Sequence, residues 1–105
     1  IFFATNKSSL TTASRATLRK QATYLRKNKN LSVTIEGHAD ERGTREYNLA
    51  LGERRANAAK DYLMTYGISG KRISVISYGK EKPVNPASTP LAWSQNRRSV
   101  TVKVN

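Results

Sequence analysis

The sequence contains no cysteine, and several other residue types are scarce. The missing cysteine excludes disulfides and every metal site built on thiolates, although it leaves the cellular compartment open. There is only one histidine, so a zinc site built from several imidazoles is also excluded. No apolar run approaches the length of a membrane-spanning helix. The chain starts at Ile1 without an apolar signal segment, so if it is exported we expect a mature piece or an excised domain.

Acidic residues are few and unevenly placed. The 105 residues hold 19 lysines and arginines against 7 acids, which gives a formal net charge of +12. The first 35 residues contain no acid, whereas six of the seven acids fall between Glu36 and Asp61. Such a charge distribution favours a polyanionic partner, which could be nucleic acid, an acidic membrane surface or an anionic cell-wall polymer. Charge alone does not choose among these partners.

Hydrophobic spacing predicts four strands and two main helices within a single domain, residues 1–105. The expected strands cover residues 1–4, 31–37, 72–78 and 99–105; the expected helices cover residues 10–27 and 45–66, with a short helical turn around Trp93. In the last strand, Val100, Val102 and Val104 are expected to face inward. Packing both helices on one face of a mixed four-stranded sheet gives an α+β fold, a two-layer α/β sandwich.

The stretch from Thr34 to Leu63 carries the candidate site, because it is expected to run from a strand through a polar loop into the long helix. Arg55 falls among the apolar residues of that helix, which are Tyr47, Leu51, Ala58, Ala59, Tyr62 and Tyr66. A buried guanidinium keeps its charge and needs a partner, so we expect Arg55 to meet a carboxylate of the protein or of a ligand. The nearest candidate is Asp40, in the loop after the strand.

Simpler interpretations compete with a binding site. For an arbitrary Asp and Arg, a structural ion pair is the better interpretation. His38 precedes Asp40 by two residues but lacks companions for a metal site or a catalytic group, so we expect neither a metal nor an enzyme. For Arg97 and Arg98, an ion pair with Glu36 or another strand-edge acid is expected rather than anion binding.

The central stretch resembles the OmpA-like peptidoglycan-binding domain. That family has an Asp after the second strand, a Gly shortly after it, and then Asn, Leu and an Arg-Ala pair along the helix; the matching residues here are Asp40, Gly43, Asn48, Leu51, Arg55 and Ala56. Three runs are similar to the envelope lipoproteins of the family rather than to its porin or flagellar-stator members: GHADERGTREYN (37–48), SYGKEKP (77–83) and NRRSV (96–100). The resemblance covers nearly the whole chain and implies the OmpA-like order β-α-β-α-β-β.

The resemblance implies non-covalent binding of the peptidoglycan stem peptide through its diaminopimelate residue. Asp40 would take the ammonium group of that residue and Arg55 its carboxylate, which suits a zwitterionic end and a planar guanidinium. No cofactor or metal is implied. The candidates for further contacts with ligand or partner are His38, Ala39, Arg42, Gly43, Thr44, Tyr47, Asn48, Leu51, Phe3, Thr5 and Asn6.

The resemblance also implies a periplasmic protein that tethers the outer membrane to the cell wall, with a lipid anchor upstream of Ile1 and with TolB-like and other Tol-system proteins as partners. Two alternatives stay open. One is a protein-interaction domain for a TolB-like partner without wall binding. The other is a nucleic-acid-binding module using the basic residues of 10–27, for which the sequence offers neither an aromatic stacking platform nor a recognition-helix motif.

Two positions depart from the family pattern. Ala4 stands where an acidic residue is common, so any contact made by that carboxylate is lost. Gly52 stands where serine is usual, which is expected to loosen the helix slightly without touching a charged role.

Overall fold

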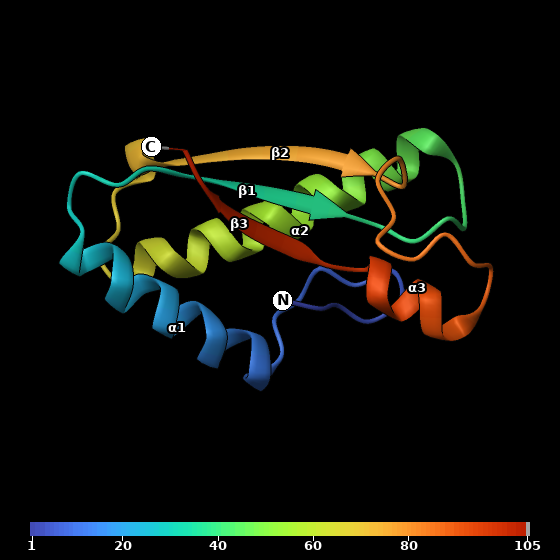
Figure 1. Cartoon of the computed structure of the whole chain (residues 1–105), viewed down its shortest axis with the longest axis horizontal. Helices are drawn as coiled ribbons and strands as arrows, with labels where there is room; N and C mark the ends of the chain where they lie inside the picture. The colour runs from blue at the N-terminus through green and yellow to red at the C-terminus, as the bar shows by residue number, and fades with distance from the viewer. Residues whose placement is uncertain (105) are drawn as a thin grey trace.

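The computed structural model describes residues 1–104 and consists of a three-stranded sheet with two long helices packed together on one side (Figure 1). The elements in chain order are α1 (Thr12–Lys27), β1 (Val33–His38), α2 (Arg45–Thr65), the 3-10 turn η1 (Gly70–Arg72), β2 (Ile73–Gly79), α3 (Pro90–Asn96) and β3 (Ser99–Lys103). None of the helices in residues 1–104 is long and apolar enough to cross a bilayer.

The two long helices begin at polar caps and bury one apolar stripe each. The Thr11 side chain caps α1 by accepting from the backbone N–H of Ser14, and Thr44 caps α2 by accepting from the N–H of Tyr47. From α1 the core takes Leu18, Ala22 and Leu25; from β1, Val33 and Ile35; and from α2, Ala56, Ala59 and Leu63. Leu18, Ala22 and Leu25 are three or four residues apart, so they lie on one face of α1.

β1 is the central strand, and the sheet order is β2-β1-β3. β1 runs parallel to β2, with Val33 opposite Ile73, and antiparallel to β3, with Val33 opposite Lys103. The mixed sheet is therefore confirmed, and its parallel pair is joined by α2 in the usual crossover arrangement. Because β1 is central and α2 follows it directly, the β1–α2 loop lies at the carboxyl end of the sheet's middle strand.

The predicted first strand does not form, so the sheet has three strands and not four. Phe2 makes only an isolated antiparallel bridge with Arg98. The chain turns away directly afterwards, because the N–H of Lys7 donates to the carbonyl of Ala4 and Asn6 adopts a positive φ of 56°. Residues 1–4 thus reach the strand edge without extending a ladder along it.

The inward orientation predicted for the valines near the C-terminus is wrong. Val100, Val102 and Val104 are 36%, 40% and 62% exposed. The antiparallel register sets Val100 opposite Glu36 and Val102 opposite Thr34, whose side chains face away from the helices, whereas Thr101 shares the face of buried Ile35. Of the predicted strand 99–105, Asn105 lies outside the described residues.

α2 approaches β1 closely at a pair of glycines. A Cβ on Gly37 would overlap the carbonyl of Gly52, and a Cβ on Gly52 would overlap the Ser77 hydroxyl and lie 2.9 Å from the Gly37 carbonyl oxygen. Because any side chain at Gly52 would meet Ser77 and Gly37, glycine at this position allows the close contact between α2 and the sheet. Its effect on intrinsic helix stability is secondary to that packing.

Candidate functional site

The β1–α2 loop is held rigidly where the predicted site lies. Gly43 adopts a φ of 93°, in the left-handed region that glycine enters at no steric cost. The Asn48 side chain, 2% exposed, reaches back from α2 and donates to the carbonyls of Arg42 at 2.8 Å and Thr44 at 3.0 Å. The helix therefore fixes the loop from within, and the position of Asp40 follows from that loop.

A cavity of about 460 Å³ opens between this loop, α2 and the N-terminal segment. Its lining consists of Thr5, Asn6, Asp40, Arg42, Gly43, Tyr47, Asn48, Leu51 and Arg55. The fold thus brings Asp40 and Arg55 to one cavity together with seven of the eleven additional candidates. The remaining four, Phe3, His38, Ala39 and Thr44, do not line it.

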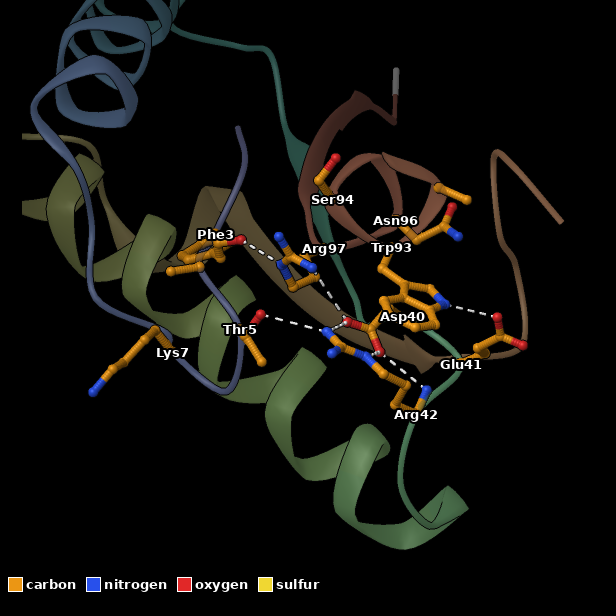
Figure 2. A network of polar contacts seen from close by, with 12 residues as sticks. Phe3, Thr5, Lys7, Asp40, Glu41, Arg42, Trp93, Ser94, Asn96 and Arg97 are labelled. Carbon is orange, nitrogen blue, oxygen red and sulfur yellow. Dashed lines mark hydrogen bonds and ion pairs between the residues drawn. The ribbon is translucent and has the colours of Figure 1, made fainter. Parts of the chain in front are cut away.

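Asp40 is buried and is bonded by two arginines (Figure 2). Its Oδ1 accepts from the backbone N–H of Arg42 at 3.0 Å and from Arg42 Nε at 3.1 Å. Its Oδ2 accepts from Arg42 Nη2 at 2.7 Å and from Arg97 Nη1 at 3.5 Å. Burial raises the pKa of Asp40, but the bonds from Arg42 and Arg97 outweigh burial and hold that pKa below its usual value. Asp40 is therefore an anion at neutral pH.

Arg55 is fully buried, and the partners that the protein gives it are backbone carbonyls rather than the Asp40 carboxylate. Nε donates to the carbonyl of Lys7 at 2.9 Å, Nη1 to that of His38 at 2.8 Å and Nη2 to that of Ala4 at 3.1 Å. Its guanidinium also lies 5.3 Å from the centroid of the Phe3 ring. Burial and the nearby charge of Arg97 lower the pKa of Arg55 to about 10, so it stays cationic at neutral pH.

The charges around the cavity do not cancel. Its lining holds one carboxylate, from Asp40, and two guanidiniums, from Arg42 and Arg55, while Arg97 adds a third guanidinium beside Asp40. Carbonyl oxygens satisfy hydrogen-bond donors of Arg55 but bring no negative charge. The arrangement can therefore accept an anionic group while keeping one carboxylate for a cation.

A second layer of contacts, which the sequence did not reveal, brings α3 to the site together with the loop before it, residues 80–89, which contains Pro83 and Pro86. The guanidinium of Arg42 lies 4.2 Å from the centroid of the Trp93 ring. Trp93 Nε1 donates to Glu41 Oε2 at 2.7 Å (Figure 2). The Ser88 hydroxyl donates to Glu41 Oε1 at 2.8 Å. Trp93 and Ser88 lie 52 and 47 positions from Glu41 in the chain, and the only signal in the sequence was the single tryptophan next to a proline-rich segment.

His38 contributes its backbone to the site, while its ring lies elsewhere. Its carbonyl accepts from Arg55, whereas Nε2 lies 3.1 Å from Glu36 Oε1 and the ring stacks on Tyr78 with centroids 5.5 Å apart. Burial lowers the pKa of His38, although the bond to Glu36 opposes that shift. Glu36 therefore pairs with His38. Arg97 was expected to pair with Glu36 or another strand-edge acid, and in the structure it pairs with Asp40.

Residues 1–104 contain no group of three or more histidines, cysteines or acids placed to hold a metal ion.

Comparison with known proteins gives consistent matches. The profile of the OmpA family matches residues 2–97. A protein of Rhizobium meliloti (strain 1021) named peptidoglycan-associated lipoprotein is 59% identical over 102 residues, covering 97% of this chain and 58% of that protein. A protein of the same name from Agrobacterium fabrum is 54% identical with the same coverage. The chain thus spans about three fifths of the length of these curated relatives.

Solved structures agree with the sequence matches. The crystal structure of the peptidoglycan-associated lipoprotein from Burkholderia pseudomallei superposes with a TM-score of 0.95 at 38% identity, covering 98% of this chain and 87% of that chain. The C-terminal domain of Helicobacter pylori MotB superposes with a TM-score of 0.90 at 19% identity, covering 99% of this chain and 82% of that chain, a likeness of fold alone.

Proposed function

This chain belongs to the OmpA family, and from that premise we propose that it binds peptidoglycan without catalysing a reaction and tethers the outer membrane to the cell wall. The relatives at 59% and 54% identity are named for association with peptidoglycan, which supports this function. We place the protein in the periplasm beside the outer membrane, anchored by lipid upstream of the present chain as the name lipoprotein suggests for the relatives.

The observation that carries the proposal is a buried carboxylate and a buried guanidinium on the wall of one cavity. The side-chain end of diaminopimelate bears an ammonium group and a carboxylate on the same carbon. In our proposal the ammonium group binds Asp40 and the carboxylate binds Arg55. Arg55 uses three of its five N–H donors on backbone carbonyls, which leaves two for a carboxylate.

Arg42 has to move when such a ligand binds. Its Nη2 bonds Asp40 Oδ2 and lies 3.4 Å from the Thr5 hydroxyl, so the side chain extends from the β1–α2 loop to the N-terminal segment at the cavity. The ligand's ammonium group would replace Arg42 on Asp40, and Arg42 would retain its stacking on Trp93. Arg97 stays beside Asp40 because its Nε is held by the carbonyl of Phe3 at 2.9 Å.

The same surface is our proposed contact for TolB-like and other Tol-system proteins. Arg42 and Tyr47 line the cavity and are exposed, so a protein partner can reach them without entering the cavity. If the same residues serve both ligands, wall binding and Tol-protein binding exclude each other. Competition between a soluble muropeptide and TolB for the labelled domain measures this directly, and simultaneous binding would contradict a shared surface.

Co-sedimentation with insoluble peptidoglycan tests the proposed function. The chain is expected to sediment with diaminopimelate-containing walls and much less with lysine-containing walls, whose side-chain ends lack the carboxylate that Arg55 would bind. Asp40→Asn is expected to remove the binding. Asp61→Asn, which neutralises an exposed acid on α2, is the matched control and should bind as the parent does. Equal binding to both wall types would contradict the proposal.

A further inference from the structure

The end of the molecule opposite the candidate site carries a groove that the proposed function does not use. Figure 1 places the last turn of α1 and the end of β3 at one end of the long axis, which measures 40 Å, and the β1–α2 loop at the other end. The groove between α1 and β3 has a volume of about 310 Å³. Its floor is apolar, formed by Leu25, Leu31 and Val33.

Lysines surround this apolar floor. Lys20 from α1 and Lys103 from β3 line the groove, and Lys103 Nζ lies 5.1 Å from the centroid of the Tyr24 ring, which is 45% exposed. A second hollow of about 430 Å³ continues past Tyr24 and is lined by Lys27 and Lys29. Neither lining contains an aspartate or glutamate. We call the two hollows together the α1–β3 groove.

The end of α1 weakens this positive field only in part. The last carbonyls of a helix carry partial negative charge, which would repel an anion. Here the guanidinium of Arg72 bonds one of them, with Nη2 donating to the carbonyl of Leu25 at 2.8 Å. It also bonds two carbonyls just beyond the helix, those of Asn28 (Nη2, 2.8 Å) and Leu31 (Nε, 3.0 Å). The groove therefore presents cations around an apolar floor, and Arg72 offsets part of the negative charge at the end of α1.

We propose that the α1–β3 groove docks on the anionic surface of a lipid bilayer. The four lysines contact phosphate head groups, and the exposed Tyr24 ring and the half-buried Leu31 lie at the level where head groups meet acyl chains. Lysine stems and tyrosine rings suit that interface because each joins an apolar body to a polar end. Phosphate head groups attract such basic clusters over about one Debye length.

Two features favour a bilayer over nucleic acid. A nucleic-acid backbone would satisfy the lysines but leave the exposed Tyr24 ring and the half-buried Leu31 without an apolar partner. Single-stranded nucleic acid binds through bases stacked on open aromatic faces, whereas Lys103 already occupies a face of Tyr24. A lipid surface supplies both the phosphate and the apolar region.

Vesicle co-sedimentation of the whole chain tests this proposal. The probes are vesicles of phosphatidylcholine mixed with phosphatidylglycerol and vesicles of phosphatidylcholine alone. The groove variant is Lys20→Gln with Lys103→Gln. The matched control is Arg54→Gln with Lys82→Gln, which removes the same charge from exposed positions that line neither hollow. Both variants should keep the parent's unfolding midpoint, because all four side chains are exposed.

We expect binding to the mixed vesicles, little binding to the neutral ones, and a loss of affinity of about 30-fold in the groove variant. The control should stay within a few-fold of the parent, and added salt should weaken binding. Equal losses in the two variants would mean that only net charge matters and would overturn the proposal. So would tighter binding to a DNA duplex at equal phosphate concentration, which would assign the groove to nucleic acid. Wall binding, measured separately with Asp40→Asn, is unaffected by either result.

Discussion

Arg55 Nη1 donates to the backbone carbonyl of His38 at 2.8 Å, so the last residue of β1 is bonded to the middle of α2. Two further bonds from the same guanidinium reach Ala4 and Lys7. Arg55 therefore bonds the long helix to the central strand and to the N-terminal segment before α1. It holds these cavity walls together and also lines the cavity itself.

We predict that Arg55→Ala destabilises the protein by about 3 kcal/mol or more, because three carbonyls lose a charged donor in a buried region. Arg55→Lys should cost less, since an ammonium group retains the charge but cannot reach all three carbonyls. Urea unfolding followed by circular dichroism measures both. Arg54→Ala, at the exposed neighbouring position, is the control and should change stability by less than about 0.5 kcal/mol. A similar small loss at Arg55 would contradict this structural role.

Arg42→Gln is predicted to raise the pKa of Asp40. Burial already disfavours the carboxylate, and the wild-type pKa is low because the hydrogen bonds from Arg42 and Arg97 outweigh that burial. Stability contributed by a carboxylate with a lowered pKa is present above its unfolded value of 3.8 and is lost as pH falls through the folded value. As the pH falls, Arg42→Gln should therefore lose the stability that the Asp40 carboxylate contributes at a higher pH than the parent does.

Carboxyl NMR titration of Asp40 in the parent and in Arg42→Gln measures that shift. Arg45→Gln is the control, because Arg45 pairs with Glu81 and not with Asp40. An unchanged Asp40 pKa in Arg42→Gln would contradict the prediction, because it would show that Arg97 and the local field lower the Asp40 pKa without help from Arg42.

The pKa of His38 predicts a second loss of stability at mildly acidic pH. His38 has a lowered pKa when folded, so below its unfolded value of 6.5 the unfolded chain binds the extra proton and the folded state is disfavoured. The free energy of unfolding should therefore fall as pH drops below about 6.5. His38→Gln should show less of this slope in urea titrations between neutral pH and pH values above the carboxylate range. An identical slope in parent and variant would contradict the assignment.

Gly37→Ala is predicted to destabilise the protein severely, by about 3 kcal/mol or more, because the added methyl group would overlap the backbone of α2 at Gly52. Gly70→Ala is the matched control, since its new methyl group would meet only the flexible side-chain ends of Met64 at 3.3 Å and Lys60 at 3.7 Å. Thermal unfolding compares the two. Similar unfolding temperatures for Gly37→Ala and Gly70→Ala would contradict the prediction, because they would show that α2 can shift away from β1 with little loss of stability.

The sequence predicted most of the fold because its signals were local. The bounds of α2, β1 and β2 were within a residue or two of those predicted, since glycines, caps and alternating apolar residues mark them. β3 was placed correctly but its faces were reversed. Which face a strand presents depends on its register with β1, and the alternating valines satisfy a half-exposed strand as well as a buried one.

The site was predicted in part for the same reason. Asp40 and Arg55 were drawn from one continuous stretch, and the fold places both on one cavity. Their partners come from far away in the chain: Ala4 and Lys7 bond Arg55 across about fifty residues, and Arg97 approaches Asp40 from the C-terminal end. A local pattern carries no information about such convergence. The expectation that Arg55 meets a carboxylate stays a prediction for the ligand, because the partners that the protein supplies are three backbone carbonyls, which satisfy N–H donors without neutralising the charge.

Calorimetric titration with soluble muropeptides measures whether the cavity binds diaminopimelate through Asp40 and Arg55. The parent chain is titrated with a diaminopimelate-containing muropeptide and with its lysine-containing counterpart, and Asp40→Asn and Arg55→Lys are titrated alongside the Asp61→Asn control. We expect the parent and the control to bind the diaminopimelate-containing muropeptide and to discriminate against the lysine-containing one. Both site variants should lose about 2 to 5 kcal/mol of binding while remaining folded. Binding of both ligands with equal affinity, or undiminished binding by folded Asp40→Asn, would contradict this expectation.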